Sequence, residues 1–90
     1  MQITIYSDNG HAWGKVKKAL LDRLGIAKDI SPYSFMRDDY AFLDEDSDLP
    51  RLCSALREQG KAVSFNERVA KYNQSKIRQY EEYKAWWVTI

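Results

Sequence analysis

The chain has 90 residues, of which 44% are hydrophobic and 30% charged, and its formal net charge is +1. This size supports one domain with a modest core, and no apolar run approaches the roughly 20 residues that cross a bilayer. The first residues lack the pattern of a secretory signal, and the single cysteine excludes an intramolecular disulfide. We therefore expect a cytoplasmic protein without a membrane partner.

The first predicted elements are a strand and a helix. Ile3 and Ile5 alternate with more polar neighbours, which predicts a strand over Gln2–Ser7. Residues 7–10 are a signal for a turn or for the start of a helix. Apolar residues then recur at intervals of three, four and four positions, which predicts an amphipathic helix that Gly25 ends. The residues of this stripe are Trp13, Val16, Leu20 and Leu24.

A hairpin and a second helix follow. Tyr33–Arg37 and Tyr40–Asp44 are aromatic-rich runs on either side of Asp38-Asp39, so we expect two antiparallel strands joined by a tight turn. A second amphipathic helix is expected over Asp48–Gln59, and a fourth strand over Ala62–Glu67. Further along the chain the pattern fits a helix and an added strand equally well.

In chain order these elements are β-α-β-β-α-β, which is the split βαβ or ferredoxin-like arrangement. The sequence therefore predicts an α+β fold in which a four-stranded antiparallel sheet carries two helices on one face. We expect residues 1–70 to form this domain. Residues 71–90 are an aromatic-rich C-terminal extension that either packs on the domain or serves as an interface.

The first candidate for a binding surface is a run of acids between positions 38 and 48. The helix dipole accounts for Asp46 and Asp48, but not for Asp38 and Asp39, which we expect at the tip of the hairpin. Such a run can imitate a phosphate backbone or meet a basic partner. The predicted partner-binding residues are these acids and the tail aromatics: Asp38, Asp39, Asp44, Glu45, Asp46, Tyr83, Trp86 and Trp87.

The aromatic strand residues allow a second interpretation. Tyr40 and Phe42 share one face of a strand, and Tyr6 joins them if the isoleucines of the first strand point inward. RNA-recognition domains stack bases on such a face, although the neighbouring acids of this chain repel phosphate. The structural alternative is that these aromatics are buried beneath the C-terminal segment.

The chain offers few residues for catalysis or metal binding. His11 is the only histidine, and it is either structural or a general base oriented by Asp8. Cys53 falls on the apolar stripe of the second helix, where free cysteine acts as a small core residue. Alternating acids from Asp44 onward lack the glycine and glutamate of a calcium loop. We therefore predict a non-enzymatic protein with no metal site and no cofactor.

Several short motifs resemble a group of small, largely uncharacterised proteins carried by phages, prophages and plasmids. The motifs are YSDNGHAW at 6–13, LGIA at 24–27, ISPYSF at 30–35, YAFLDED at 40–46 and SKIR at 75–78. The group has no established activity, so the resemblance identifies no catalytic or binding residue. It implies a gene on a mobile element, where small proteins with acidic patches often act on host defence.

Together these features lead to two functional hypotheses. The first is a phage or mobile-element accessory protein that inhibits a host protein or ribonucleoprotein complex through its acidic surface, as anti-CRISPR or anti-restriction proteins do. The second is an RNA- or single-stranded-DNA-binding domain that uses the aromatics of the sheet face. The first predicts no affinity for oligonucleotides, whereas the second predicts an affinity that falls as salt rises.

Overall fold

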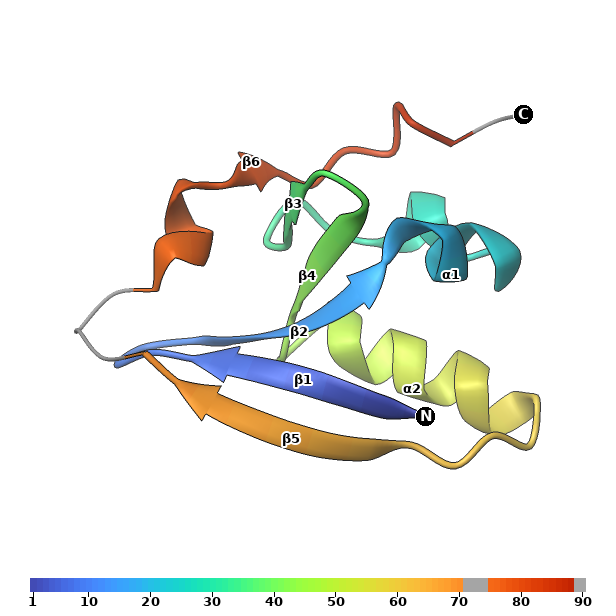
Figure 1. The fold of residues 1–90 in the computed structure, drawn as a ribbon. Helices are drawn as coiled ribbons and strands as arrows, with labels where there is room; N and C mark the ends of the chain where they lie inside the picture. Colours follow the sequence, from blue (N-terminus) through green and yellow to red (C-terminus); the bar gives the residue numbers. More distant parts are fainter. Residues whose placement is uncertain (71–74, 89–90) are drawn as a thin grey trace.

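The computed structural model of the chain describes residues 1–70 and 75–88 (Figure 1). Within these ranges a single sheet holds its strands in the order β5-β1-β2-β4-β3-β6. The strands are β1 (Gln2–Ser7), β2 (Ala12–Lys17), β3 (Phe35–Arg37), β4 (Tyr40–Asp44), β5 (Ser64–Val69) and β6 (Glu81–Glu82). The helical elements are α1 (Lys18–Arg23), α2 (Asp48–Glu58) and the 3-10 turns η1 (Ala27–Asp29) and η2 (Lys76–Gln79).

The first predicted helix is wrong over its first half, which is strand β2. The turn signal before it closes a hairpin, in which the amide of Asp8 donates to the carbonyl oxygen of His11 (2.8 Å). Trp13 and Val16 have helical spacing, but they lie on opposite faces of the sheet and pack in two different apolar clusters. The helix that remains, α1, has only 6 residues.

These strands overturn the ferredoxin-like prediction. Among the described residues the sheet has six strands rather than four, and it is mixed rather than antiparallel. β5 pairs with β1 in parallel, whereas the pairs β1–β2, β2–β4, β3–β4 and β3–β6 are antiparallel. One main helix, α2, packs on the sheet in place of two comparable helices. Of the predicted fold, the α+β class alone is partly consistent with the structure.

The later elements agree better with the sequence. The β3–β4 hairpin is confirmed, with Phe35 opposite Phe42 and Arg37 opposite Tyr40, although β3 begins two residues later than the predicted strand. Asp38 at its turn has a φ of 54°, a left-handed conformation that aspartate tolerates better than most residues. Helix α2 is confirmed within one residue of its predicted end, and β5 begins and ends two residues later than expected.

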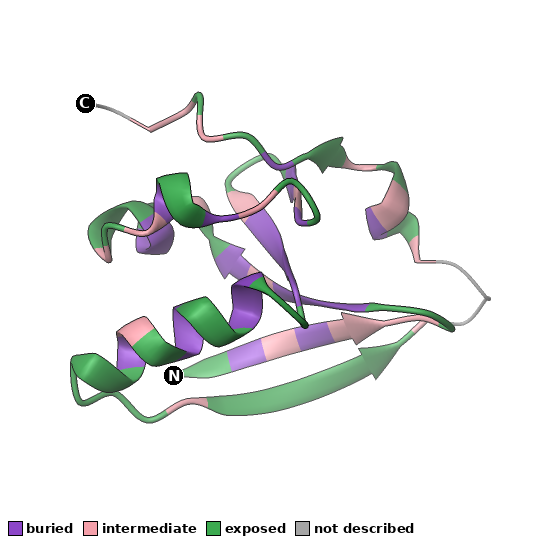
Figure 2. Ribbon diagram, turned by 180° about the vertical axis from the view of Figure 1, so that it is seen from behind, coloured by how far each residue is buried: buried purple, intermediate pink, exposed green. Residues whose placement is uncertain are grey.

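Helix α2 covers one face of the sheet, and the main core lies between them (Figure 2). Gly14 of β2 permits the contact, because a Cβ at this position would lie 2.7 Å from Cδ1 of Leu49. Cys53 is buried in this core, as predicted. Asp48, the first residue of α2, is also buried, and its carboxylate accepts hydrogen bonds from the hydroxyls of Ser31 and Ser34.

Residues 75–88 cross the edge of the sheet at β3 (Figure 1). η2 lies against the face opposite α2, where Ile77 joins a second, aromatic cluster. β6 then pairs with β3, and the side chain of Tyr83 enters the main core on the other face. Of the expected C-terminal extension, residues 71–74 and 89–90 lie outside the described residues.

Candidate functional site

The face of the sheet opposite α2 gathers aromatic and basic side chains. Residues paired across neighbouring strands point to the same side of a sheet. The pairs on this face are Tyr6–Trp13, Lys15–Phe42 and Lys17–Tyr40. The structure therefore brings Tyr6, Tyr40 and Phe42 to one face, as the strand alternation indicates, and it adds lysines that sequence reasoning had placed on a helix.

The C-terminal segment closes one half of this face. The ring of Tyr80 lies 5.1 Å from that of Phe42, measured between centroids, and Ile77 packs beside it. Phe42 is 7% exposed and Trp13 is 2% exposed. Neither ring is open to a ligand. Phe42 is therefore buried beneath the C-terminal segment, as the structural alternative for the strand aromatics states, whereas Tyr6 and Tyr40 are only half-buried.

An ion pair attaches this segment to the turn between β1 and β2. The carboxylate of Asp8 accepts from Arg78 through Nε (2.6 Å) and Nη2 (2.9 Å), and from the amide of Ser75 (2.8 Å). The Arg78 guanidinium, together with the backbone amides of Ser75, Gly10 and His11, holds the pKa of Asp8 well below its usual range. Asp8 also accepts from the amide of His11 (3.0 Å), so it fixes the turn and anchors the segment. The general-base alternative for His11 requires its imidazole to pair with the carboxylate of Asp8, and this pairing is not among the hydrogen bonds of Asp8 within residues 1–70 and 75–88.

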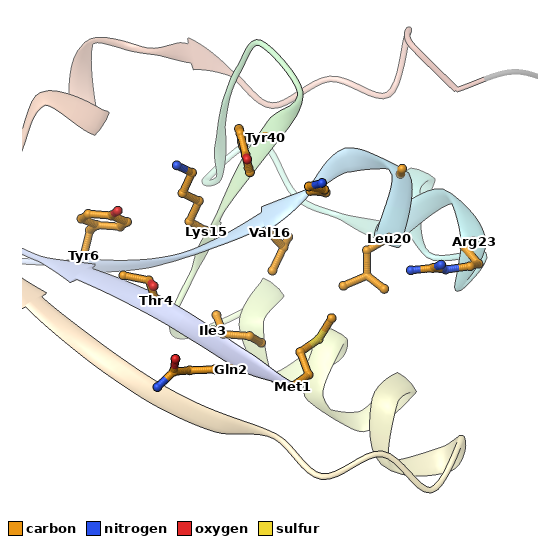
Figure 3. A pocket seen from close by; sticks show the side chains of 12 residues that line it. Met1, Gln2, Ile3, Thr4, Tyr6, Lys15, Val16, Leu20, Arg23 and Tyr40 are labelled. Atoms are coloured by element: carbon orange, nitrogen blue, oxygen red, sulfur yellow. The ribbon is translucent and has the colours of Figure 1, made fainter.

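The other half of the face is open and forms a groove of about 720 Å³ between β1, β2 and the start of α1 (Figure 3). We call it the cationic groove. Its polar and aromatic lining residues are Gln2, Thr4, Tyr6, Lys15, Lys17, Arg23 and Tyr40. The rest of the lining is apolar and includes Ile3, Val16 and Leu20 of the main core. Lys15 lies between the two tyrosines, with its Nζ 4.1 Å from the centre of the Tyr40 ring. No aspartate or glutamate of the described chain lines this groove.

The predicted acidic surface is divided between the two ends of β4. Asp38 and Asp39 are exposed at the β3–β4 turn, whereas Glu45 and Asp46 are exposed beyond the other end of the strand. The five residues of β4 keep the two pairs roughly 15–20 Å apart. Asp44 is buried between them and accepts hydrogen bonds within the fold. The acids therefore form two small groups and no continuous patch.

The tail aromatics are also divided. Tyr83 is buried, and its hydroxyl donates to the carbonyl oxygen of Ala27. Burial, followed by the nearby charge of Asp48, raises the pKa of Tyr83 to about 12. Trp87 is half-buried with its ring edge-on to Tyr83, and Trp86 is 70% exposed. Only Trp86 is freely available to a partner.

A second hollow, of about 510 Å³, lies beside the cationic groove and shares Lys17 and Tyr40 with it. We call it the hairpin hollow. Its other charged and aromatic lining residues are Lys18, Asp22, Asp38, Asp39 and Trp87, and the Nζ of Lys18 lies 5.8 Å from the centre of the Trp87 ring. The indole Nε1 of Trp87 is buried and has no hydrogen-bond partner among the described residues. One pair of predicted acids and one tail aromatic thus meet at a single site.

Sequence reasoning missed the cations of the groove for a local reason. Lys15 and Lys17 fall between the apolar residues of the predicted helix, and lysines at such positions are usually solvated. Their alternation with Trp13 along β2 is the signal that places all three on one face. Arg23 joins them only because α1 follows β2 directly, which the sequence pattern did not show.

No family model matches the chain, and no curated protein or solved structure matches it. The resemblance to proteins of phages, prophages and plasmids stays a prediction based on short motifs. Within the described residues, no helix has the length and apolar character that spanning a membrane requires.

Proposed function

We propose that this protein binds single-stranded RNA or DNA in the cationic groove, as a binding protein rather than an enzyme. The main support is the composition of the groove. Lys15, Lys17 and Arg23 supply positive charge beside the rings of Tyr6 and Tyr40. The rest of the lining is mostly apolar, and no carboxylate among the described residues lines the groove. Single-stranded nucleic acid needs this combination of cations for phosphates and aromatic rings for bases.

The shape of the groove also fits a strand of nucleic acid. Its volume of about 720 Å³ lies in the range of ligand sites, and it is open along the sheet rather than enclosed. Tyr6 and Tyr40 stand on opposite sides of Lys15, because β2 lies between β1 and β4. One base can stack on the ring of Tyr6. A second can stack on Tyr40 once the Lys15 ammonium, which lies over that ring (4.1 Å), turns to the phosphate between the two bases. Asp38 and Asp39, which would repel phosphate, face the neighbouring hollow.

Fluorescence anisotropy with short labelled RNA and DNA strands tests this proposal. If the three groove cations each neutralise one phosphate, the logarithm of the binding constant falls with the logarithm of salt concentration with a slope of about −2. Lys15→Gln should weaken binding and reduce the slope by about 0.7. Tyr6→Leu should cost about 1–3 kcal/mol of binding free energy through lost stacking.

The matched control is Lys28→Gln, which makes the same charge change at an exposed position outside the groove. It should leave both the affinity and the slope almost unchanged. No binding at low salt would remove the proposal. An equal loss for Lys28→Gln and Lys15→Gln would show nonspecific attraction by net charge and would contradict the groove as the site.

A second candidate function is inhibition of a host macromolecular complex, of the anti-CRISPR or anti-restriction kind. The observation in its favour is the hairpin hollow, where the carboxylates of Asp22, Asp38 and Asp39 outnumber the ammonium groups of Lys17 and Lys18. Such a hollow offers a small excess of negative charge to a basic side chain of a partner. The partner contact is then smaller than the continuous acidic surface that the sequence suggests.

Phage plating on cells that carry a CRISPR or restriction system tests this second candidate. Expression of the protein should restore phage growth, and Asp38→Lys combined with Asp39→Lys should abolish the effect, because two charges at the hollow are reversed. The control pair is Glu58→Lys with Glu67→Lys, which reverses two exposed acids elsewhere. If the variant with Asp38→Lys and Asp39→Lys restores phage growth fully, this second candidate function is eliminated.

A further inference from the structure

Three side chains that suit a metal ion meet where β4 ends and β2 begins. The amide of Glu45 donates to the carbonyl oxygen of Ala12 (3.1 Å), which holds the two chain segments side by side. As a result, ligand atoms of His11, Asp44 and Asp46 all lie within 4.8 Å of one another. His11 is far from the two aspartates in the sequence, so the fold alone creates this cluster.

Asp44 has the properties of a preformed ligand. Its side chain is 8% exposed, and its Oδ2 accepts from the amide of Asp46 (3.2 Å) and from the amide (3.2 Å) and hydroxyl (2.9 Å) of Ser47. Its other oxygen, Oδ1, accepts no hydrogen bond from residues 1–70 or 75–88 and is accessible to solvent, so it can coordinate an ion while Oδ2 fixes the orientation of the carboxylate. Asp44 and His11 line the same hollow, of about 230 Å³.

The surroundings leave the cluster free to take a cation. His11 and Asp46 are exposed, so their side chains can turn toward a shared ion, while the backbone of His11 is held by Asp8 (3.0 Å). Arg78 also lines the hollow, but its guanidinium is paired with Asp8 (2.6 Å). The two carboxylates of the cluster therefore face no unpaired arginine.

We propose that His11, Asp44 and Asp46 bind a divalent transition-metal ion of the Zn²⁺ or Mn²⁺ class. One imidazole nitrogen and two carboxylate oxygens suit these ions, whereas Ca²⁺ and Mg²⁺ prefer oxygen ligands alone. Three protein ligands leave at least one coordination position for water. The sequence argued against a zinc site because it holds one histidine and one cysteine, and it argued against a calcium loop at the acids from Asp44 onward because the required glycine and glutamate are absent.

Isothermal titration calorimetry of the whole chain with Zn²⁺ tests the site, with Mn²⁺ and Mg²⁺ as comparison ions. We expect one bound Zn²⁺ per chain, and at least about tenfold weaker binding for both His11→Ala and Asp46→Asn, since even indirect ligand losses weaken metal sites by this much. Both side chains are exposed, so the variants should fold. Glu45→Gln removes an adjacent exposed charge outside the cluster and should bind as the parent does.

A second measurement locates the ion. Substoichiometric Mn²⁺ should broaden the backbone amide signals of residues 11–13 and 44–47 before others in a nitrogen–proton correlation spectrum. Broadening centred on the hairpin acids at 38–39, no saturable binding at millimolar metal, or equal binding by the parent and His11→Ala would each overturn the proposal.

Discussion

At the scale of single residues, Gly14 shows how one missing side chain sets the distance between helix and sheet. A Cβ at position 14 would lie 2.7 Å from Cδ1 and 3.3 Å from Cδ2 of Leu49, both in a closed core. Overpacking of this kind costs about 1–3 kcal/mol, and the stiffer unfolded chain of an alanine variant recovers only about 0.4–1 kcal/mol. We expect Gly14→Ala to lower the free energy of unfolding by about 1–2 kcal/mol, measured by urea denaturation.

The partner of the clash supplies the control. In a Leu49→Ala background the space beside β2 is already empty, so adding Gly14→Ala should cost nothing or should stabilise the protein slightly. The double variant is then more stable than the sum of the two separate losses predicts, and the difference equals roughly the loss caused by Gly14→Ala alone. Additive losses in the double variant would mean that helix α2 does not press on Gly14.

At the scale of elements, the hairpin and α2 were predictable, and β2 was not. The β3–β4 hairpin and α2 each have a local pattern that matches their own period and clear signals at their ends. β2 passes directly into α1 at Lys17, which is still extended (φ −73°, ψ 138°). Trp13 and Val16 of β2 and Leu20 of α1 are three and four positions apart, which is helical spacing. The pattern therefore did not show where the strand ends and the helix begins.

The candidate site was likewise predictable only where a local sequence pattern specifies it. The shared face of Tyr6, Tyr40 and Phe42 came from alternation within strands, which the sequence displays. The groove cations and the cluster around His11 come from pairing between strands, and local pattern does not specify pairing. The parallel pairing of β5 with β1 is another such feature, since it joins Gln2 to Ser64 across most of the chain.

At the scale of the whole molecule, the C-terminal segment connects the two faces of the sheet. Its first part supports the aromatic cluster through Ile77, and its later part places Tyr83 in the main core, where the hydroxyl donates to Ala27. The segment therefore acts as a clamp across the β3 edge. A change that weakens the Tyr83 contact should destabilise the whole fold rather than release a free tail.

The pH dependence of unfolding tests this clamp. The pKa of Tyr83 is raised from about 10 to about 12 by burial, so the folded protein prefers the neutral phenol. The stabilisation is complete below pH 10 and is lost as pH rises toward 12, by roughly 1–3 kcal/mol. Tyr83→Phe lacks the titrating group and the hydrogen bond to Ala27, so it should be less stable than the parent at pH 8 but should lose less stability between pH 8 and pH 11.5. Urea denaturation at the two pH values measures the difference, and equal losses for both proteins would show that Tyr83 does not hold the segment in the core.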